Sequence, residues 1–476
     1  MRAHARRTLL PLAVILLAAC ATNPVTGKRQ LAMITESQEI AMGQEAARQV
    51  AAQMGLYDDP ELQAYVDRVG QEMAAVSERP EIPWQFAVVD DPTVNAFALP
   101  GGPVFLTRGI LAHFNNEAEM ASVLGHEIGH ITARHAVEQV SKQQLAGLGL
   151  GLAMILSPEV AQFGDLANLG LQLMFLKFGR DDERQSDDLG LRYMTDAGWD
   201  PRHMPPVFGV ISEISRLQGG GRIPAWASTH PDPENRAQRL AAQIGQLGAA
   251  GGRVNPDGYL AMLDGMIFGE NPREGYVIGS AFIHPDLAFR ITFPEGWAIQ
   301  NMRQQVIAVS PREDAAVGLS LARGSSPAEA ARSFFSQQGI QAGSEWRQNI
   351  YTFQAGSAQQ GAVYRGLAGF VSHRGQVLQI VGYTPAQLFD RYANLLAGAV
   401  ASFTSETNPT YVNVEPKRID VVKVPRRMTL EEFARAYPST VDLQTLAIAN
   451  GAIRQDFVFE PGQPAKRIVG GRLPTR

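Results

Sequence analysis

Two histidines four residues apart, with a glutamate beside the first, are the residues of this sequence best suited to chemistry. His126, Glu127 and His130 form the pattern H-E-x-x-H within a stretch of helical periodicity. Four residues advance about 400° along a helix, so the two imidazoles lie one turn apart on the same face. Both rings could then reach one Zn²⁺ at about 2.0–2.1 Å, while Glu127 takes a proton from the attacking water. Two histidines on a purely structural helix are the alternative that the motif alone leaves open.

A catalytic zinc site also needs a third protein ligand and an open fourth position. His135 is a poor candidate, because on a continuous helix it would lie about 180° from His126. Glu183 and Asp187 are better placed, since residues four apart share one face of a helix. One carboxylate could bind the metal while the other accepts the outward N–H of a ligating imidazole. Taken alone, the acidic run 181–188 also fits a solvated helix face.

Four segments of the sequence together resemble one family of zinc peptidases. They are NPVTG at 23–27, NAFALPGG at 95–102, LGHEIGH at 124–130, and a glutamate helix that ends in DAGWDP at 196–201. The family includes the CAAX prenyl proteases, the heat-shock membrane protease HtpX and the periplasmic β-barrel assembly-enhancing protease, and the resemblance covers roughly residues 23–247. It implies a mainly helical, gluzincin-like domain that binds one zinc ion per chain and cuts polypeptides. It also implies that Glu183 is the third ligand and that Asp187 supports the site; Ser186 replaces the Ala that usually precedes this Asp.

The same resemblance assigns two further parts of the site. It implies an edge strand that pairs with an extended substrate backbone, and this strand is formed by Asn95, Ala96, Phe97 and Ala98. A plain edge strand is the alternative. It also places His230 and Arg236 near the metal, where either could stabilise the oxyanion of the tetrahedral intermediate. His230 could instead cap the metal at rest, because a neutral imidazole is a good zinc ligand. A loop histidine and a helix-surface arginine without these roles also remain open.

The N-terminal residues resemble the signal of a bacterial lipoprotein. Arginines at 2, 6 and 7 precede the apolar run 9–19, which is too short to span a bilayer as a helix, since that needs about 20 residues. The run ends in Leu-Ala-Ala-Cys, which resembles a lipobox. We therefore expect a signal peptide at 1–19 and lipid on Cys20, and Ala21 resembles the sorting signal for the outer membrane. A chance cysteine after a plain cleaved signal is the alternative.

The charge balance argues against nucleic acid as a partner. The chain has 42 Lys and Arg against 47 Asp and Glu, a net charge of −5. Loss of the three N-terminal arginines would make it −8, because 39 basic residues would face the same 47 acidic ones. A mildly acidic protein is not built around a polyanion. Cys20 is the only cysteine, so no disulfide can form within the chain.

We expect three domains and an α+β fold class. The first, 21–248, is the peptidase domain with a small edge sheet, and the second, 254–408, alternates apolar and polar residues and is similar to the photosystem II extrinsic protein PsbP. The third, 410–476, has βααβ order and resembles a LysM domain, the peptidoglycan-binding module. In the first domain helices are expected at 37–54, 61–75, 115–140, 181–197 and 233–247, and strands at 84–89 and 94–106.

Two regions keep open interpretations. The apolar region 145–178 is interrupted at 157–159 and at 165, so it is not one transmembrane helix. Core helices are one interpretation, and an interfacial or lid segment near the membrane is the other. In the LysM-like domain, Arg427 and Met428 stand where a Gly-Asp pair is expected. Glycan binding and a bare packing role therefore both remain open for it.

The sequence favours a lipid-anchored zinc endopeptidase of the bacterial periplasm that acts on misfolded or stalled envelope proteins. The alternative is a lipoprotein scaffold or chaperone-like binder with a capped or structural zinc site. The presence of Glu127 favours the enzyme, because a scaffold has no need of a catalytic base.

Overall fold

The structure is a computed structural model, and the residues that it describes fall into two compact units. They are 20–151, 173–174, 176–217, 225–230, 233–248, 251–347, 349–356, 363–454 and 456–474. One unit holds the chain up to Gly269 together with Arg418–Val469, and the other holds Glu270–Lys417 and the last residues. The expected signal peptide and most of the apolar region 145–178 lie outside the described residues. Within the described part, no helix has both the length and the apolar character needed to cross a membrane.

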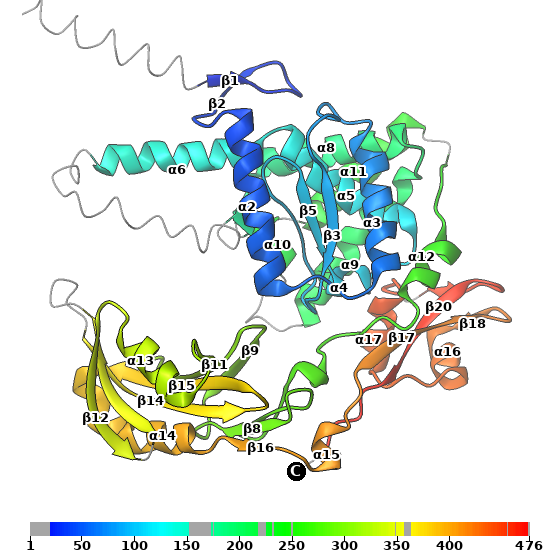
Figure 1. Ribbon diagram of the computed structural model, residues 1–476. Helices are drawn as coiled ribbons and strands as arrows, with labels where there is room; N and C mark the ends of the chain where they lie inside the picture. Colours follow the sequence, from blue (N-terminus) through cyan, green and yellow to red (C-terminus); the bar gives the residue numbers. More distant parts are fainter. Residues whose placement is uncertain are drawn as a thin grey trace, which may run out of the picture. The chain divides into compact units, whose positions relative to one another are not determined.

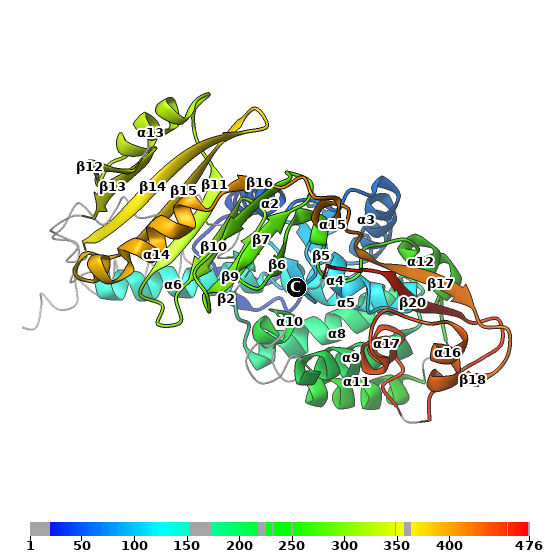
Figure 2. The ribbon, with the colours of Figure 1, turned by 90° about the horizontal axis from the view of Figure 1, so that it is seen from below.

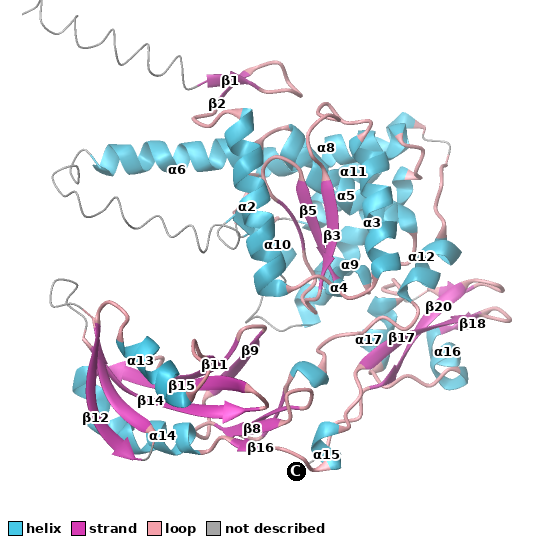
Figure 3. Ribbon diagram, in the orientation of Figure 1, coloured by secondary structure: helices cyan, strands magenta, loops and turns pink. Residues whose placement is uncertain are grey.

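The fold class is α+β, as expected, and the first unit is mainly helical (Figure 3). Four of the five expected helices occur within a few residues of their predicted bounds. Four helices, at 108–111, 204–217, 225–229 and 256–263, had not been predicted. The helices of this unit before its C-terminal part are α2 (Glu36–Met54), α3 (Pro60–Ala74), α4 (Arg108–Leu111), α5 (Glu117–Thr132), α6 (His135–Gly151), α8 (Arg180–Asp196), α9 (Met204–Leu217), α10 (Ala225–Thr229), α11 (Pro233–Leu247) and α12 (Pro256–Leu263).

A three-stranded sheet lies beside these helices, with α2 and α3 packed against it (Figure 1). Strands β3 (Gln85–Val89) and β5 (Pro103–Thr107) run parallel, and β4 (Ala96–Ala98) pairs with β5 alone, antiparallel. The turn between β4 and β5 uses Gly101, whose φ of 75° favours glycine. A Cβ there would also lie 2.5 Å from the Cα of Ile40 on α2. The expected edge strand is thus at the edge of the sheet.

The helix that carries the H-E-x-x-H motif is shorter than predicted. The prediction of one helix to about residue 140 is wrong, because α5 ends at Thr132 and α6 begins at His135. Arg134, between them, has a φ of 58°, in the left-handed region that ends helices. Its Nε donates to Glu39 on α2 over 2.8 Å, and this buried ion pair holds the break in place. The chain therefore changes direction directly before His135.

Small residues let α5 and α8 pack closely. A Cβ on Gly129 would lie 3.0 Å from the Cα of Ser186, and one on Gly190 would lie 2.8 Å from the backbone N of His126. The motif's own glycine is therefore required for packing, and the backbones approach closely where the expected ligands lie. Helices α9 and α11 lie next to this pair and contact each other, as the view from below in Figure 2 shows.

The C-terminal part of the first unit has the two helices and outer strands of the expected βααβ order, with one further two-residue strand on each side of the helices. Its sheet pairs are β17 (Lys417–Lys423) with β20 (Pro464–Gly470) and β18 (Met428–Thr429) with β19 (Val458–Phe459), and its helices are α16 (Leu430–Ala436) and α17 (Leu443–Ala449). Ile419, Ile448 and Ile468 belong to the same hydrophobic cluster as Leu124 of α5. This module therefore shares its core with the helices that hold the motif.

The second unit is built on antiparallel sheets, as its alternating sequence predicts. A seven-stranded sheet has the order β12-β13-β14-β15-β11-β10-β9, a four-stranded sheet has the order β16-β8-β7-β6, and α14 (Phe389–Ala401) packs on β14 and β15. The strands are β6 (Tyr276–Ile278), β7 (Ala281–His284), β8 (Phe289–Thr292), β9 (Ala298–Met302), β10 (Gln305–Val309), β11 (Ala316–Leu321), β12 (Ile340–Arg347), β13 (Ile350–Ala355), β14 (Tyr364–His373), β15 (Gln376–Pro385) and β16 (Thr404–Ser405), and α13 spans Pro327–Phe335.

Candidate metal centre

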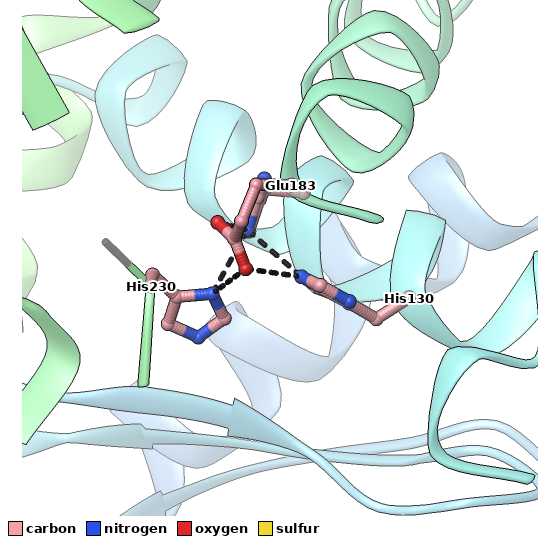
Figure 4. A group of neighbouring side chains, drawn as sticks. His130, Glu183 and His230 are labelled. Carbon is pink, nitrogen blue, oxygen red and sulfur yellow. Dashed lines mark hydrogen bonds and ion pairs between the residues drawn. The ribbon is translucent and has the colours of Figure 1, made fainter. Parts of the chain in front are cut away.

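Four buried side chains converge in the first unit. His126 and His130 come from α5, Glu183 comes from α8, and His230 directly follows α10. One ligand atom from each lies within 4.8 Å of the other three. Figure 4 shows the carboxylate of Glu183 between the rings of His130 and His230. Each of the four residues is at most 2% exposed, so they form an interior cluster.

The spacing within this cluster fits a tetrahedral zinc. Ligand atoms at about 2.0–2.1 Å from such an ion are about 3.3–3.4 Å from one another. Here Nε2 of His126 is 3.1 Å from Nε2 of His130 and 3.3 Å from Nδ1 of His230. Oε1 of Glu183 is 3.5 Å from Nε2 of His130 and 2.9 Å from Nδ1 of His230. Three nitrogens and one carboxylate oxygen that face one another at these distances are a suitable donor set for that metal.

The protonation states of His130 and Glu183 also suit metal binding. Burial, reinforced by the neighbouring imidazoles, holds the pKa of His130 well below its usual value, so this ring is neutral. Burial alone would raise the pKa of Glu183, but His230 and Arg236 outweigh it and lower this pKa, so the carboxylate is ionised. For His230, burial acts against protonation, yet the carboxylates of Glu183 and Glu127 raise its pKa. His130 is thus neutral and Glu183 ionised, as metal ligands must be, while the two carboxylates favour a proton on His230 in the metal-free site.

Asp187 and Arg236 contact the ligand side chains from outside the cluster. Oδ1 of Asp187 is 3.1 Å from Nδ1 of His126, the ring nitrogen that faces away from the other ligands. Arg236 donates to both oxygens of Asp187, over 3.0 and 2.7 Å, and its Nη1 lies 2.6 Å from Oε2 of Glu183. Burial raises the pKa of Asp187, but hydrogen bonds from His126 and Arg236 dominate and hold it below the usual range. The two carboxylates of α8 thus share one arginine.

Glu127 is the one carboxylate of this centre without a hydrogen bond. It is 1% exposed, and neither of its oxygens has a hydrogen-bond partner among the described residues. The Nε2 atom of His230 is 3.6 Å from its Oε1. A buried carboxylate with free acceptor sites carries a desolvation cost that structural residues avoid. Such a group is suited to accept a proton from a reactant.

The expected substrate strand lies close to the ligands. A cleft beside His130 is lined by Ala98 and Leu99 at the end of β4, and by Phe178. Asn95, at the start of this segment, is 3% exposed, and its Oδ1 lacks a partner in the described part of the chain. Ala96 and Phe97 are buried, and Phe97 stacks on Phe105 of β5. The structure therefore brings the end of β4, rather than its whole length, to the cleft.

Two aromatic residues near the cluster were missed from the sequence. The ring of Trp226 stacks on His230 with centroids 4.8 Å apart, and the guanidinium of Arg236 lies over the Trp226 ring. Phe178 stacks on His130 with centroids 4.0 Å apart. The four-residue spacing of Trp226 and His230 was a usable signal, because it puts both on one helix face. Phe178 lies in the segment before α8 and carries no such signal.

Comparison with known proteins agrees with this geometry. Residues 60–244 match the model of peptidase family M48. The Beta-barrel assembly-enhancing protease of Yersinia pestis is 32% identical over 232 residues, which are 47% of this chain and 47% of that protein. The protein of the same name from Escherichia coli strain K12 is 29% identical over 250 residues, half of each chain. The Mitochondrial metalloendopeptidase OMA1 of Arabidopsis thaliana is 36% identical over 187 residues, 39% of this chain and 36% of that protein.

The chain thus spans about half the length, or less, of the curated relatives it matches. Among solved structures, the cyanobacterial PsbP of Synechocystis sp. PCC 6803 covers 27% of this chain and 94% of its own, with 15% identity and a TM-score of 0.21. At that TM-score, the PsbP-like character of residues 254–408 stays a prediction. The family match spans both helices that supply the converging ligands, so residues 60–244 carry a metallopeptidase domain that matches peptidase family M48.

Proposed function

We propose that this protein is a zinc-dependent endopeptidase. The observation that carries the proposal is the convergence of His126, His130 and Glu183 beside the carboxylate of Glu127, which has no hydrogen-bond partner among the described residues. Zinc, when bound, is a Lewis acid that polarises a peptide carbonyl and makes water nucleophilic at neutral pH. The ring nitrogens and the Glu183 carboxylate would hold it.

Residues of the chain itself transfer the proton, orient the substrate and position the ligands. Glu127 accepts the proton of the attacking water and returns it to the leaving amine nitrogen, which is general acid–base catalysis. The edge strand that ends at Ala98 orients an extended substrate backbone next to His130. Asp187 holds the ring of His126. Arg236 is engaged by both carboxylates of α8, so we assign it to positioning those carboxylates rather than to the oxyanion.

His230 is the natural candidate for a resting-state cap. Its Nδ1 lies within the ligand cluster, where it would complete a closed four-ligand site. A peptide carbonyl can approach only after this ring moves away. The competing role, oxyanion stabilisation, needs His230 to face the substrate instead of the ligands.

The place of action that we propose is the bacterial cell envelope. The names of the Yersinia and Escherichia relatives connect those proteins with β-barrel assembly. By this similarity, the substrates here are misfolded or stalled envelope proteins in the periplasm. The lipobox-like sequence before Cys20 would anchor the chain by lipid, with the outer membrane as the expected site.

For the LysM-like module, the shared core favours a packing role over peptidoglycan binding. Lys466 in β20 is fully buried, and its Nζ donates to the carbonyls of Ala112 and Phe114 over 2.8 Å each. These contacts join the module to the segment that precedes α5. Pelleting of the whole chain with purified peptidoglycan, well above that of a lipoprotein without such a module, would instead support glycan binding.

The alternative function, a lipoprotein scaffold or chaperone-like binder, makes a different demand on the site. A scaffold with structural zinc leaves no purpose for a buried carboxylate without hydrogen bonds. The test is zinc content per chain, together with casein hydrolysis, in the purified protein before and after treatment with a chelator. One zinc per chain and casein hydrolysis that zinc restores after chelation support the peptidase. Stoichiometric zinc with no hydrolysis, also in His230→Ala, supports the scaffold.

A further inference from the structure

A third histidine lies next to the metal cluster without joining it. His135 is 2% exposed, and its Nδ1 is 3.0 Å from Nδ1 of the ligand His130. The Nε2 atom of His130 faces the cluster, so the contact with His135 uses the nitrogen on the opposite side of the ring. On the far side of His135, its Nε2 is 3.1 Å from Oε1 of Gln185. A chain of three side chains therefore leads outward from the metal position.

The protons along this chain can be assigned from its two ends. At the inner end, Nε2 of His130 must offer a lone pair to bind a metal, so a neutral His130 carries its proton on Nδ1. Nδ1 of His135 then has to accept this proton's hydrogen bond. A neutral His135 with Nδ1 as acceptor carries its own proton on Nε2, where the carbonyl oxygen of Gln185 accepts it. Asp182 Oδ1, 3.8 Å from the same Nε2, favours a donor there as well.

The break between α5 and α6 makes this arrangement possible. On a continuous helix, five residues advance about 500°, which would put His135 about 140° away from His130. The left-handed residue Arg134 redirects the chain, so that His135 contacts the ring it would otherwise have missed. Gln185 lies on α8, two residues after Glu183, so the chain of hydrogen bonds ends on the helix that supplies the third ligand.

The two ligand histidines of α5 are oriented by partners of different chemistry. His126 faces a carboxylate, Asp187, which is itself bound by Arg236. His130 faces a second imidazole that is followed by an amide. A carboxylate partner makes a ligand imidazole more basic, and a neutral partner does so less. One ligand histidine is thus oriented by a carboxylate and the other by an imidazole.

We propose that His135 and Gln185 form a neutral relay that fixes His130 as its Nδ1–H tautomer and so keeps its Nε2 free for the metal. This inference rests on the proposed metal site. It gives His135 the part of a positioning residue, because it acts through His130 and touches neither metal nor substrate. The relay also gives a role to a buried histidine that catalysis does not use.

The first test measures zinc affinity by competition with a chelator. His135→Leu leaves the His130 N–H buried without an acceptor, and the dissociation constant for zinc should rise about 10–100-fold, as for other lost outer partners. His135→Asn places a carbonyl oxygen where Nδ1 was, so it should restore most of the affinity. Gln185→Leu should weaken binding by a smaller factor. His113→Leu is the matched control, because the His113 ring contacts the backbone carbonyl of Gly109 and lies outside the cluster.

The second test reads the tautomers directly, in metal-free protein labelled with ¹⁵N-histidine. The relay predicts a proton on Nδ1 of His130 and on Nε2 of His135. A proton on Nε2 of His130 would overturn the proposal, and so would an unchanged zinc affinity in a folded His135→Leu variant. If the wild-type protein binds no zinc, the proposed function fails, while the tautomers still decide whether the relay exists. Circular dichroism of each variant checks its folding, and the tautomer measurement does not depend on any variant.

Discussion

His230 is held in the ligand cluster by a ring stack and by contacts of both of its ring nitrogens. Its ring stacks on Trp226, and its Nδ1 lies 2.9 Å from Oε1 of Glu183. The same ring is 3.6 Å from the carboxylate of Glu127 through its Nε2. At the scale of single residues, the resting site is therefore closed by a side chain that sits between a ligand and the catalytic base.

His230→Ala should raise proteolysis several-fold, because it would open the fourth metal position permanently. Self-cleavage should rise with it. The measurement is the rate of casein hydrolysis at equal zinc content, with His203→Ala as control, since His203 is partly exposed and its Nδ1 contacts Asn116 and not the cluster. A fall in kcat of about 10²–10³-fold would instead assign His230 to the oxyanion. Unchanged kinetics would remove both roles.

The sequence predicted the residues of this centre unevenly. His126, Glu127 and His130 follow from spacing along one helix, which needs no tertiary information. Glu183 and Asp187 needed the family resemblance as well, because acidic faces are common on solvated helices that bind no metal. No pattern in the sequence places Nδ1 of His135 against Nδ1 of His130, since that contact depends on a change of chain direction at Arg134.

At the scale of elements, a buried ion network fixes where the motif helix ends. Glu39 on α2 is 1% exposed and lies 2.8 Å from Arg79 and 2.8 Å from Arg134 through separate oxygens. Arg79 also donates to the carbonyl of Ile131, in the last turn of α5. Helical periodicity runs through this region, so sequence alone predicted one long helix. Tertiary charge pairing overrides that local preference.

Glu39→Gln should lower the free energy of unfolding by about 3–5 kcal/mol, because two arginines would lose a buried counter-charge. The measurement is the urea midpoint followed by far-UV circular dichroism. Glu45→Gln on the same helix is the control, since Glu45 pairs with Arg48 at an exposed position and should change stability by less than about 0.5 kcal/mol. Equal midpoints for the two variants would show that the network does not hold α5.

At the scale of the whole molecule, the C-terminal module is joined to the peptidase helices by a buried lysine. Burial lowers the pKa of Lys466 to about 7, although the carboxylate of Glu119 opposes this shift. His113, another titratable group near Lys466, also has its pKa lowered, chiefly by burial. The two helices and the outer strands of this module were predicted, but its two-residue strands β18 and β19 were not. The packing of this module against the peptidase helices was not predicted, because apolar contacts between segments far apart in the sequence leave no local pattern.

Stability should therefore rise with pH above neutrality. Between about pH 7 and 10.5 the unfolded chain keeps the Lys466 proton that the folded chain has lost, so folding is favoured as protons become scarce. This stabilisation shrinks as the pH falls from about 10.5 and is gone below about 7, where the folded chain also keeps the proton. Between pH 6.5 and 9, the free energy of unfolding of wild type should rise by about 2 kcal/mol more than that of Lys466→Met. Lys423→Met, at an exposed position, serves as control, and parallel curves for wild type and Lys466→Met would refute the charge assignment.

The attachment of the whole chain to a membrane depends on one residue in our account. Cys20→Ser should abolish labelling with radioactive fatty acid, because the lipid is expected on the only cysteine sulfur. The variant would then be soluble after another cleavage, or held by its uncleaved signal. Labelling equal to that of wild type would rule out the lipobox.

The central claim is that Glu127 is a base and not a ligand, beside a zinc held by its neighbours. The most direct measurement is the zinc content and the casein hydrolysis of Glu127→Gln, determined on one preparation and compared with wild type. The account predicts one zinc per chain in both proteins and a fall in hydrolysis of at least about 10²–10⁴-fold in the variant. Hydrolysis at the wild-type rate by the zinc-loaded variant would contradict the claim, and loss of zinc would show that Glu127 belongs among the ligands.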